Sequence, residues 1–153
     1  MKIRFTLNDE TTEAEITPAD PLADLLRERL SLMGTKRGCD MGGCGMCTVL
    51  LDGKSVFSCM TPAWKVDGRQ VVTVEGLARK DGKLDSLQQA FIEESAPQCG
   101  YCTSAMLIVS KELLDNNPQP SEEQVREALS AVLCRCTGYQ PYIQAVIRAA
   151  KMR

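Results

Sequence analysis

Eight cysteines and no histidine constrain this 153-residue chain more than any other feature of its sequence. The cysteines form two groups of four, one in each half of the chain: Cys39, Cys44, Cys47 and Cys59, then Cys99, Cys102, Cys134 and Cys136. Four thiolates are the number that one sulfur-ligated metal site needs. Without histidine, mixed Cys/His zinc sites and histidine-based catalysis are excluded. We therefore expect sulfur to hold any metal in this protein.

The cellular compartment decides whether clustered thiols form disulfides or bind metal. The stretch MKIRFTLNDETTE has no apolar core of signal-peptide length, and no window approaches the ~18 apolar residues of a membrane span. We therefore expect a cytoplasmic location, where clustered thiols usually bind metal. Cys134 and Cys136 flank a single arginine, and a disulfide between them would close a strained loop that removes little unfolded-state freedom.

The composition indicates a folded globular protein and no nucleic-acid partner. Hydrophobic residues make up 44% of the chain and charged residues 25%, and the net charge is −2. Lysine and arginine are scattered along the sequence, so they predict neither a nucleic-acid footprint nor a basic membrane-binding face.

Hydrophobic periodicity divides the chain into a β-rich half and a helical half. Apolar residues alternate on both sides of Asn8-Asp9, which predicts a hairpin over residues 3–16. A second hairpin is predicted around Asp52-Gly53, and VVTV at 71–74 predicts a last strand. Between the hairpins, Asp20 and Pro21 predict a helix with aspartate as its cap and proline as its first residue.

From Leu84 onward the apolar residues recur at helical spacing and predict four helices. Ser121 and Gln124 form a capping box for the third helix, and Pro141 is predicted to open the fourth. Short connections favour an antiparallel four-helix bundle. We therefore predict an α+β fold with domains at residues 1–77 and 84–153 and a linker at 78–83. Domains this small bury a marginal hydrophobic core and often need a further stabilising feature, such as a bound metal.

The first cysteine group has the spacing C-x4-C-x2-C-x11-C, which is typical of a plant-type ferredoxin 2Fe-2S site. Gly38, Gly42, Gly43 and Gly45 allow the positive φ angles and close approach that aim amide N–H groups at sulfur. The β-rich context with one helix suits a plant-ferredoxin-like β-grasp domain. A zinc site with the same four thiolates is the alternative, but zinc sites usually pair two short cysteine knuckles.

The second cysteine group has the spacing C-x2-C-x31-C-x-C. Alternate residues of an extended turn point the same way, so Cys134 and Cys136 can reach one cluster from one side. The two pairs precede or open the second and fourth predicted helices, whose N-termini would offer positive partial charge and N–H donors to an anionic cluster. Such donors raise a reduction potential. The pattern predicts a sulfur-ligated metal between two helix starts and leaves zinc open.

The segments QCGYCTSAM (98–106) and LCRCTGY (133–139), following GCDMGGCGMC, resemble the iron–sulfur component of the molybdenum hydroxylase family. That family includes xanthine dehydrogenase, aldehyde oxidoreductase and carbon monoxide dehydrogenase. The resemblance covers nearly the whole chain and keeps the order of all eight cysteines. It implies a plant-ferredoxin-like domain followed by a four-helix domain, each with one 2Fe-2S cluster held by its four cysteines.

The resemblance also implies a role in electron transfer, without a substrate site on this chain. Electrons would leave a molybdopterin-bound molybdenum centre on a large subunit and pass the cluster of the helical domain. They would then pass the cluster of the ferredoxin-like domain and reach FAD on a medium subunit. Gln98 and Cys136 match family positions that approach the molybdopterin. The implied assembly is a dimer of heterotrimers.

The chain departs from the family pattern at three places that spare all eight cysteines. Ala131-Val132 stands where Gly-Asn is common, Ser104-Ala105 where Pro-Gly is common, and Met46 where alanine is frequent. These changes bear on contacts to the molybdenum cofactor and on packing near the clusters. A free-standing two-cluster electron carrier and a zinc-stabilised interaction module are the alternative functions. The helical domain argues against the free carrier, because a lone ferredoxin needs no second cluster domain.

Overall fold

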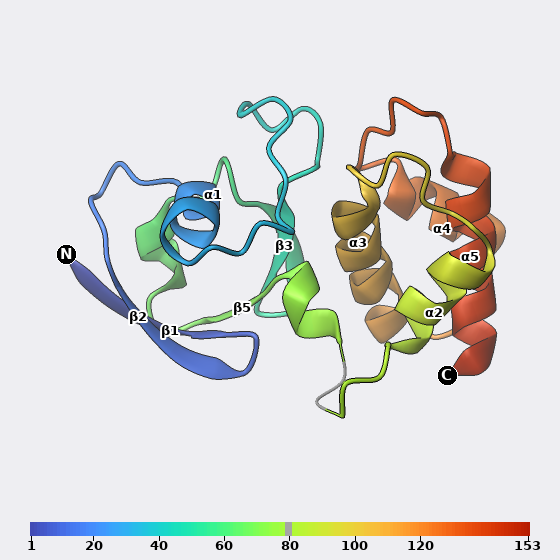
Figure 1. Ribbon diagram of the computed structural model, residues 1–153, viewed down its shortest axis with the longest axis horizontal. Helices are drawn as coiled ribbons and strands as arrows, with labels where there is room; N and C mark the ends of the chain where they lie inside the picture. The colour runs from blue at the N-terminus through green and yellow to red at the C-terminus, as the bar shows by residue number, and fades with distance from the viewer. Residues whose placement is uncertain (79–80) are drawn as a thin grey trace.

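The computed structural model describes residues 1–78 and 81–153 and contains a mixed sheet followed by helices (Figure 1). The five-stranded sheet has the order β2-β1-β5-β3-β4, with β1 and β5 parallel and the other neighbours antiparallel. Its strands are β1 (Lys2–Leu7), β2 (Glu10–Glu15), β3 (Thr48–Leu51), β4 (Lys54–Phe57) and β5 (Gln70–Val72). The α+β class is confirmed. None of the helices in the described residues is long and apolar enough to span a membrane.

Both predicted hairpins are confirmed, and their turns have the expected backbone. Asn8 and Asp9 take φ angles of 51° and 69°, and Asp52 and Gly53 take 49° and 78°. Paired positive φ angles of this kind match the twist of the flanking strands. The last strand ends at Val72, earlier than predicted. Beyond it the Asn8 side chain bonds both the N–H and the hydroxyl of Thr73, at 2.9 and 3.0 Å, and the chain turns into η3 (Val74–Leu77).

The helix between the hairpins does not begin as predicted. It consists of α1 (Leu22–Asp24) and one π-helical turn, η1 (Leu25–Arg29), and its N-cap is Pro21 rather than Asp20. Pro21 is extended, with φ −72° and ψ 149°, because it forms a β-bridge with Pro62 just before η2 (Ala63–Val66). The Asp20 carboxylate instead accepts the N–H and the hydroxyl of Thr17, both at 2.8 Å.

Four helices follow: α2 (Ser86–Glu93), α3 (Thr103–Asn116), α4 (Glu122–Leu129) and α5 (Tyr139–Met152). The capping box of Ser121 and Gln124 is confirmed, and α2 has an unpredicted one made by Asp85 and Gln88. Helix α5 starts at Tyr139, before Pro141. A proline there is compatible with a helix, because N–H groups of the first turn have no intrahelical partner.

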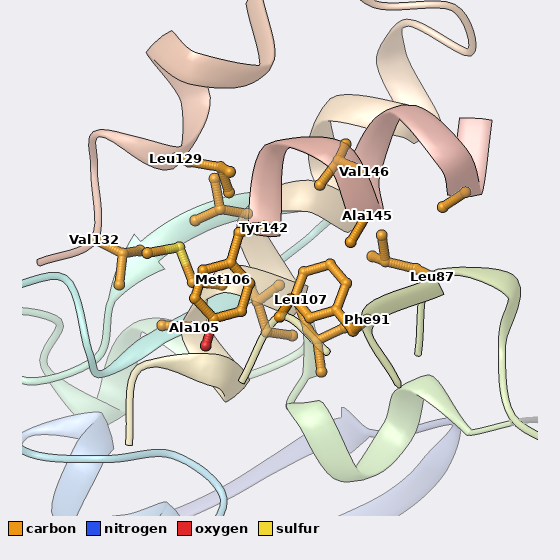
Figure 2. Close-up of a cluster of buried hydrophobic side chains, with 14 of the residues drawn as sticks. Leu87, Phe91, Ala105, Met106, Leu107, Leu129, Val132, Tyr142, Ala145 and Val146 are labelled. Atoms are coloured by element: carbon orange, nitrogen blue, oxygen red, sulfur yellow. The ribbon is translucent and has the colours of Figure 1, made fainter. Parts of the chain in front are cut away.

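Strand β3 has its two faces in two different hydrophobic cores. Val49 and Leu51 belong to the core between the sheet and α1, whereas Leu50 belongs to the core of the four helices. Figure 2 shows side chains of the helical core, among them Met106, Tyr142 and Phe91. Leu77 also packs with the helices, so the two halves share a continuous contact along β3 and α3. The predicted linker at 78–83 includes residues 79 and 80, which lie outside the described residues.

Candidate metal centres

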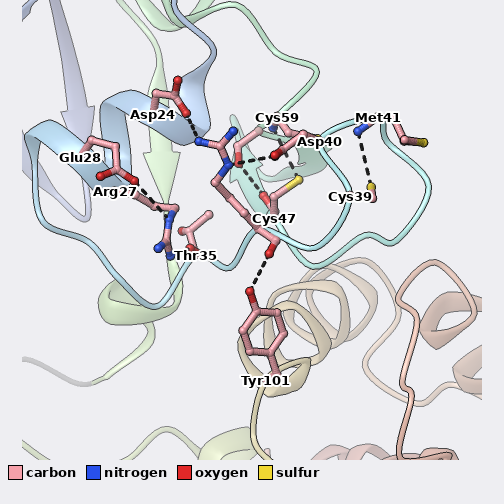
Figure 3. Close-up of polar contacts among 12 residues, drawn as sticks. Asp24, Arg27, Glu28, Thr35, Cys39, Asp40, Met41, Cys47, Cys59 and Tyr101 are labelled. Carbon is pink, nitrogen blue, oxygen red and sulfur yellow. Dashed lines mark hydrogen bonds and ion pairs between the residues drawn. The ribbon is translucent and has the colours of Figure 1, made fainter.

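The first cysteine group lies on the loop before β3 and just after β4 (Figure 3). Its thiols form two contacting pairs, Cys39 with Cys44 and Cys47 with Cys59. Cys44 and Cys47 are buried, whereas Cys39 and Cys59 are half-buried. The β3–β4 hairpin makes the second pair possible, because Ser58 bonds the Cys47 carbonyl through its N–H at 3.2 Å and its hydroxyl at 2.7 Å.

Main-chain amides of the loop and of Cys59 after β4 point at the sulfurs. The N–H of Met41 lies 3.5 Å from Cys39 Sγ, and the N–H of Cys59 lies 3.5 Å from Cys47 Sγ (Figure 3). The Met41 amide is the main reason why the pKa of Cys39 falls to about 7. Burial raises the pKa of Cys59 to about 11. Main-chain amides therefore favour negative charge at half-buried Cys39, whereas burial disfavours a free thiolate at Cys59.

The four predicted loop glycines do different things. Gly42 and Gly45 have φ angles of 75° and 69°, as predicted. Gly38 is required for close approach, because a Cβ there would lie 2.9 Å from Cys44 Sγ. Gly43 shows neither a positive φ nor a close neighbour among the described residues. Asp40, which the sequence did not indicate, takes a φ of 53°.

The second cysteine group lies where α3 and α5 begin. Cys102 is the N-cap of α3, and Cys134 and Cys136 precede α5. The thiols again form pairs, Cys102 with Cys134 and Cys99 with Cys136. Cys102 and Cys134 are 4% and 7% exposed and form an inner pair, whereas Cys99 is exposed and Cys136 half-buried. Cys134 and Cys136 therefore line the same hollow but belong to different pairs.

Gln98, Gly138 and Tyr142 complete the hollow between these four cysteines. Gln98 is exposed, and its side chain covers Gly138, where a Cβ would lie 3.0 Å from Gln98 Nε2. The Tyr101 amide is the main cause that lowers the pKa of Cys99, whereas burial raises the pKa of Cys102 to about 11. Sequence reasoning missed Tyr142, although a tyrosine in the first turn of a helix after two cysteines was a usable signal.

The pairing of the thiols distinguishes between kinds of metal centre. In the part of the chain that the structure describes, no three Cys, Asp or Glu side chains gather closely enough to hold a single metal ion. A structural zinc site needs four ligands around one ion. A 2Fe-2S cluster needs two thiolates on each of two irons. Two pairs in each group, with amides aimed at sulfur, fit the cluster better.

The two cysteine groups are joined through the main chain. The N–H of Leu133, the residue before Cys134, donates to the carbonyl of Cys44 at 2.9 Å. Gly45 lies against the same segment, because a Cβ there would be only 2.0 Å from the Ala131 carbonyl oxygen. The Tyr101 hydroxyl adds a bond to the Arg37 carbonyl at 2.5 Å (Figure 3). Cys44 of the first group is thus hydrogen-bonded to Leu133, which directly precedes Cys134 of the second group.

Comparison with known proteins matches two iron–sulfur families to this chain. Residues 5–78 match the family described as 2Fe-2S iron-sulfur cluster binding domain, and residues 73–147 match that described as 2Fe-2S binding domain. The chain is 46% identical to the nicotine 6-hydroxylase small subunit of Paenarthrobacter nicotinovorans, over 97% of this chain and 89% of that protein. It is 45% identical to the nicotinate dehydrogenase small FeS subunit of Eubacterium barkeri, over 99% and 95%. Its fold matches the structure of quinoline 2-oxidoreductase from Pseudomonas putida 86 with a TM-score of 0.94 and 44% identity, over 99% of this chain and 94% of that one.

Proposed function

Because the chain belongs to the iron–sulfur small subunits of the molybdenum hydroxylase family, we propose that it carries electrons through two 2Fe-2S clusters within a multi-subunit oxidoreductase. The observation that carries this proposal is that each set of four thiols is gathered in one place: main-chain N–H groups lie 3.5 Å from sulfur in the first set, and all four thiols of the second line one hollow. The work of such a protein is to bind, space and tune the clusters.

The pairs support an assignment of the ligands. Cys39 and Cys44 would hold one iron of the first cluster, and Cys47 and Cys59 the other. Cys102 and Cys134 would hold the inner iron of the second cluster, and Cys99 and Cys136 the outer iron. When bound, such a cluster accepts and releases one electron at a moderate potential. The chain's own amides and the N-terminus of the 14-residue helix α3 favour the more negative, reduced state.

The exposure of the second set supports a direction for electron transfer. Its outer edge carries exposed Cys99 and half-buried Cys136, with Gln98 beside them, so this edge is accessible to another protein chain. Its inner edge leads through Cys134 and the Leu133–Cys44 hydrogen bond to the first set. We propose that the outer edge faces a large subunit with the molybdopterin, and that Gln98 and Cys136 contact that cofactor.

The assembly and the division into domains are also part of what we propose. FAD on a medium subunit would take the electrons, and the complete complex would be a cytoplasmic dimer of heterotrimers. The nicotinate dehydrogenase small FeS subunit is by its name one subunit of a multi-subunit enzyme, which supports a partnership with other subunits. We also propose that α2 to α5 form an antiparallel four-helix bundle at residues 84–153, after a ferredoxin-like β-grasp domain at 1–77 and a linker at 78–83.

Metal analysis of the natively purified protein, together with its associated chains, tests this function. We expect about four irons and about four acid-labile sulfides per chain, since each 2Fe-2S cluster contributes two of each. We also expect co-purification with larger subunits that hold molybdenum and flavin. Zinc in place of iron would contradict the cluster assignment. Stoichiometric iron without any associated chain would instead favour a free-standing two-cluster carrier.

A further inference from the structure

Tyr142 places a buried hydroxyl group at the inner pair of the second cysteine set. The side chain is 1% exposed, and its oxygen lies 2.8 Å from Thr103 Oγ1 and 3.6 Å from Cys102 Sγ. The ring packs against Phe91 with centroids 5.3 Å apart and beside Met106 in the helical core (Figure 2). Because packing holds the ring, the hydroxyl has a fixed position next to the sulfur.

The chemistry of the three groups fixes the direction of the hydrogen bonds. A cysteine that binds iron does so as a thiolate and has no hydrogen to donate, so Cys102 accepts. The hydrogen on this contact therefore comes from Tyr142. The Thr103 hydroxyl can donate in turn to the tyrosine oxygen, which gives a relay from Thr103 to Tyr142 to Cys102. A tyrosine hydroxyl ordinarily has a pKa of about 10, so it keeps its hydrogen at neutral pH.

The first cysteine set has no equivalent feature among the described residues. Hydrogen bonds to its thiols there come from main-chain N–H groups and from neighbouring thiols. The hydroxyl is therefore a difference between the two sets, and it lies in a dry setting, because Cys102 is only 4% exposed. A hydrogen bond in such a setting is stronger than one in water.

We propose that Tyr142 raises the reduction potential of the second cluster by donating a hydrogen bond to Cys102 Sγ. The proposal rests on the function above. Reduction adds one electron to a centre that is already anionic, and a donor at a ligand sulfur stabilises the added charge. Tyr142 is thereby a positioning and tuning residue that makes the second cluster a better acceptor, without binding iron itself.

The test uses the assembled complex with Tyr142→Phe, which removes only the hydroxyl group. Potentiometric titration followed by electron paramagnetic resonance gives the potential of each cluster, and Cys59→Ser, which alters the first cluster's signal, assigns the two. We expect the equilibrium constant for reduction of the second cluster to fall roughly three- to tenfold, where tenfold is 59 mV for one electron. The first cluster should keep its potential.

Tyr101→Phe is the matched control. It removes the same group beside the same site, but this hydroxyl donates to the Arg37 carbonyl and not to sulfur. Both potentials should therefore stay at their wild-type values. Incorporation of 3-fluorotyrosine at position 142 strengthens the donor and should raise the second potential, while keeping the shape of the side chain.

An unchanged second potential in Tyr142→Phe with full iron content overturns the proposal, as does an equal shift of both clusters. If that variant does not assemble, the fluorotyrosine protein decides, and the absence of an upward shift overturns the proposal. Failure of the proposed function is distinguishable, because the wild-type complex would then lack two one-electron cluster signals before any substitution is made.

Discussion

The two cysteine sets have the same paired arrangement but are built in different ways. The first takes three thiols from one glycine-rich loop and the fourth from across the β3–β4 hairpin, and its amide donors are Met41 of that loop and Cys59 after the hairpin. The second takes its thiols from two segments separated by α3 and α4, and its geometry depends on how α3 packs beside α5. The first site is therefore a local structure, whereas the second is a product of tertiary packing.

The largest expected effect follows from removing a ligand of the local site. In Cys59→Ala, the pair with Cys47 is lost, and iron should fall from about four to about two per chain. The second site should remain, because helices α3 and α5 build it. Iron analysis and paramagnetic resonance of the reduced protein measure this. Met60→Ala, at an adjacent residue that is 59% exposed, is the control and should keep all its iron. Loss of both clusters in Cys59→Ala would mean that the sites are not independent.

Gly45 tests the contact between the two sites. Gly45→Ala places a Cβ 2.0 Å from the Ala131 carbonyl oxygen at a residue with φ 69°. Gly68→Ala is the matched control, because Gly68 has a φ of 72° and open space around it. Both variants should lose about 1–2 kcal/mol of unfolding free energy from the left-handed backbone. Gly45→Ala should lose clearly more unfolding free energy than Gly68→Ala, and it should also lose iron. Equal losses of unfolding free energy in the two variants, measured by chemical denaturation, would contradict a contact between Gly45 and Ala131.

Gln98 tests the exposed edge of the second site. Gln98→Ala should keep full iron content and both cluster signals, because the amide is not a ligand. In the complex it should slow reduction of the second cluster by substrate roughly tenfold, since losing a buried hydrogen bond costs about 1–3 kcal/mol. Rapid mixing with substrate measures the rate, and Gln144→Ala, at an exposed glutamine of the same half, is the control. A wild-type rate combined with a lower melting temperature would assign Gln98 to helix stability alone.

The smallest expected effect concerns the join between the halves away from the cysteines. Glu112 on α3 accepts the main-chain N–H of Ser55 on β4 at 3.0 Å. Glu112→Ala should lower the unfolding free energy by about 1 kcal/mol and leave both clusters in place. Glu123→Ala, on an exposed position of α4, should change it by less than half as much. Thermal unfolding of the two variants side by side would refute the role of Glu112 if their curves coincided.

Local signals in the sequence were enough for much of the fold. Asn8-Asp9 and Asp52-Gly53 define their hairpins, and Ser121 with Gln124 defines the start of α4, because each acts within a few residues. Asp20 failed as a cap because Pro21 pairs with Pro62, a partner that no local pattern reveals. For the same reason, the short apolar run of β3 did not show that Leu50 packs with the helices.

The candidate sites also contain features that local sequence signals predict and features that depend on tertiary packing. The spacing of the first four cysteines and the φ angles of Gly42 and Gly45 follow from the loop itself and could be predicted. The split of Cys134 and Cys136 into different pairs could not, because each meets a partner placed by α3. Tyr142 was missed because helical periodicity predicts only that such a tyrosine is buried in the core. It does not show which group the hydroxyl contacts.

The hydrogen bond between Leu133 and Cys44 requires the main-chain N–H of Leu133 but not its side chain. Its donor is the N–H of Leu133, which every residue except proline possesses, while the Leu133 side chain is 53% exposed. This position can therefore accept many substitutions without losing the connection between the sites. We expect its side chain to diverge with the surface it meets, so that the same conducting core can serve enzymes whose large subunits differ.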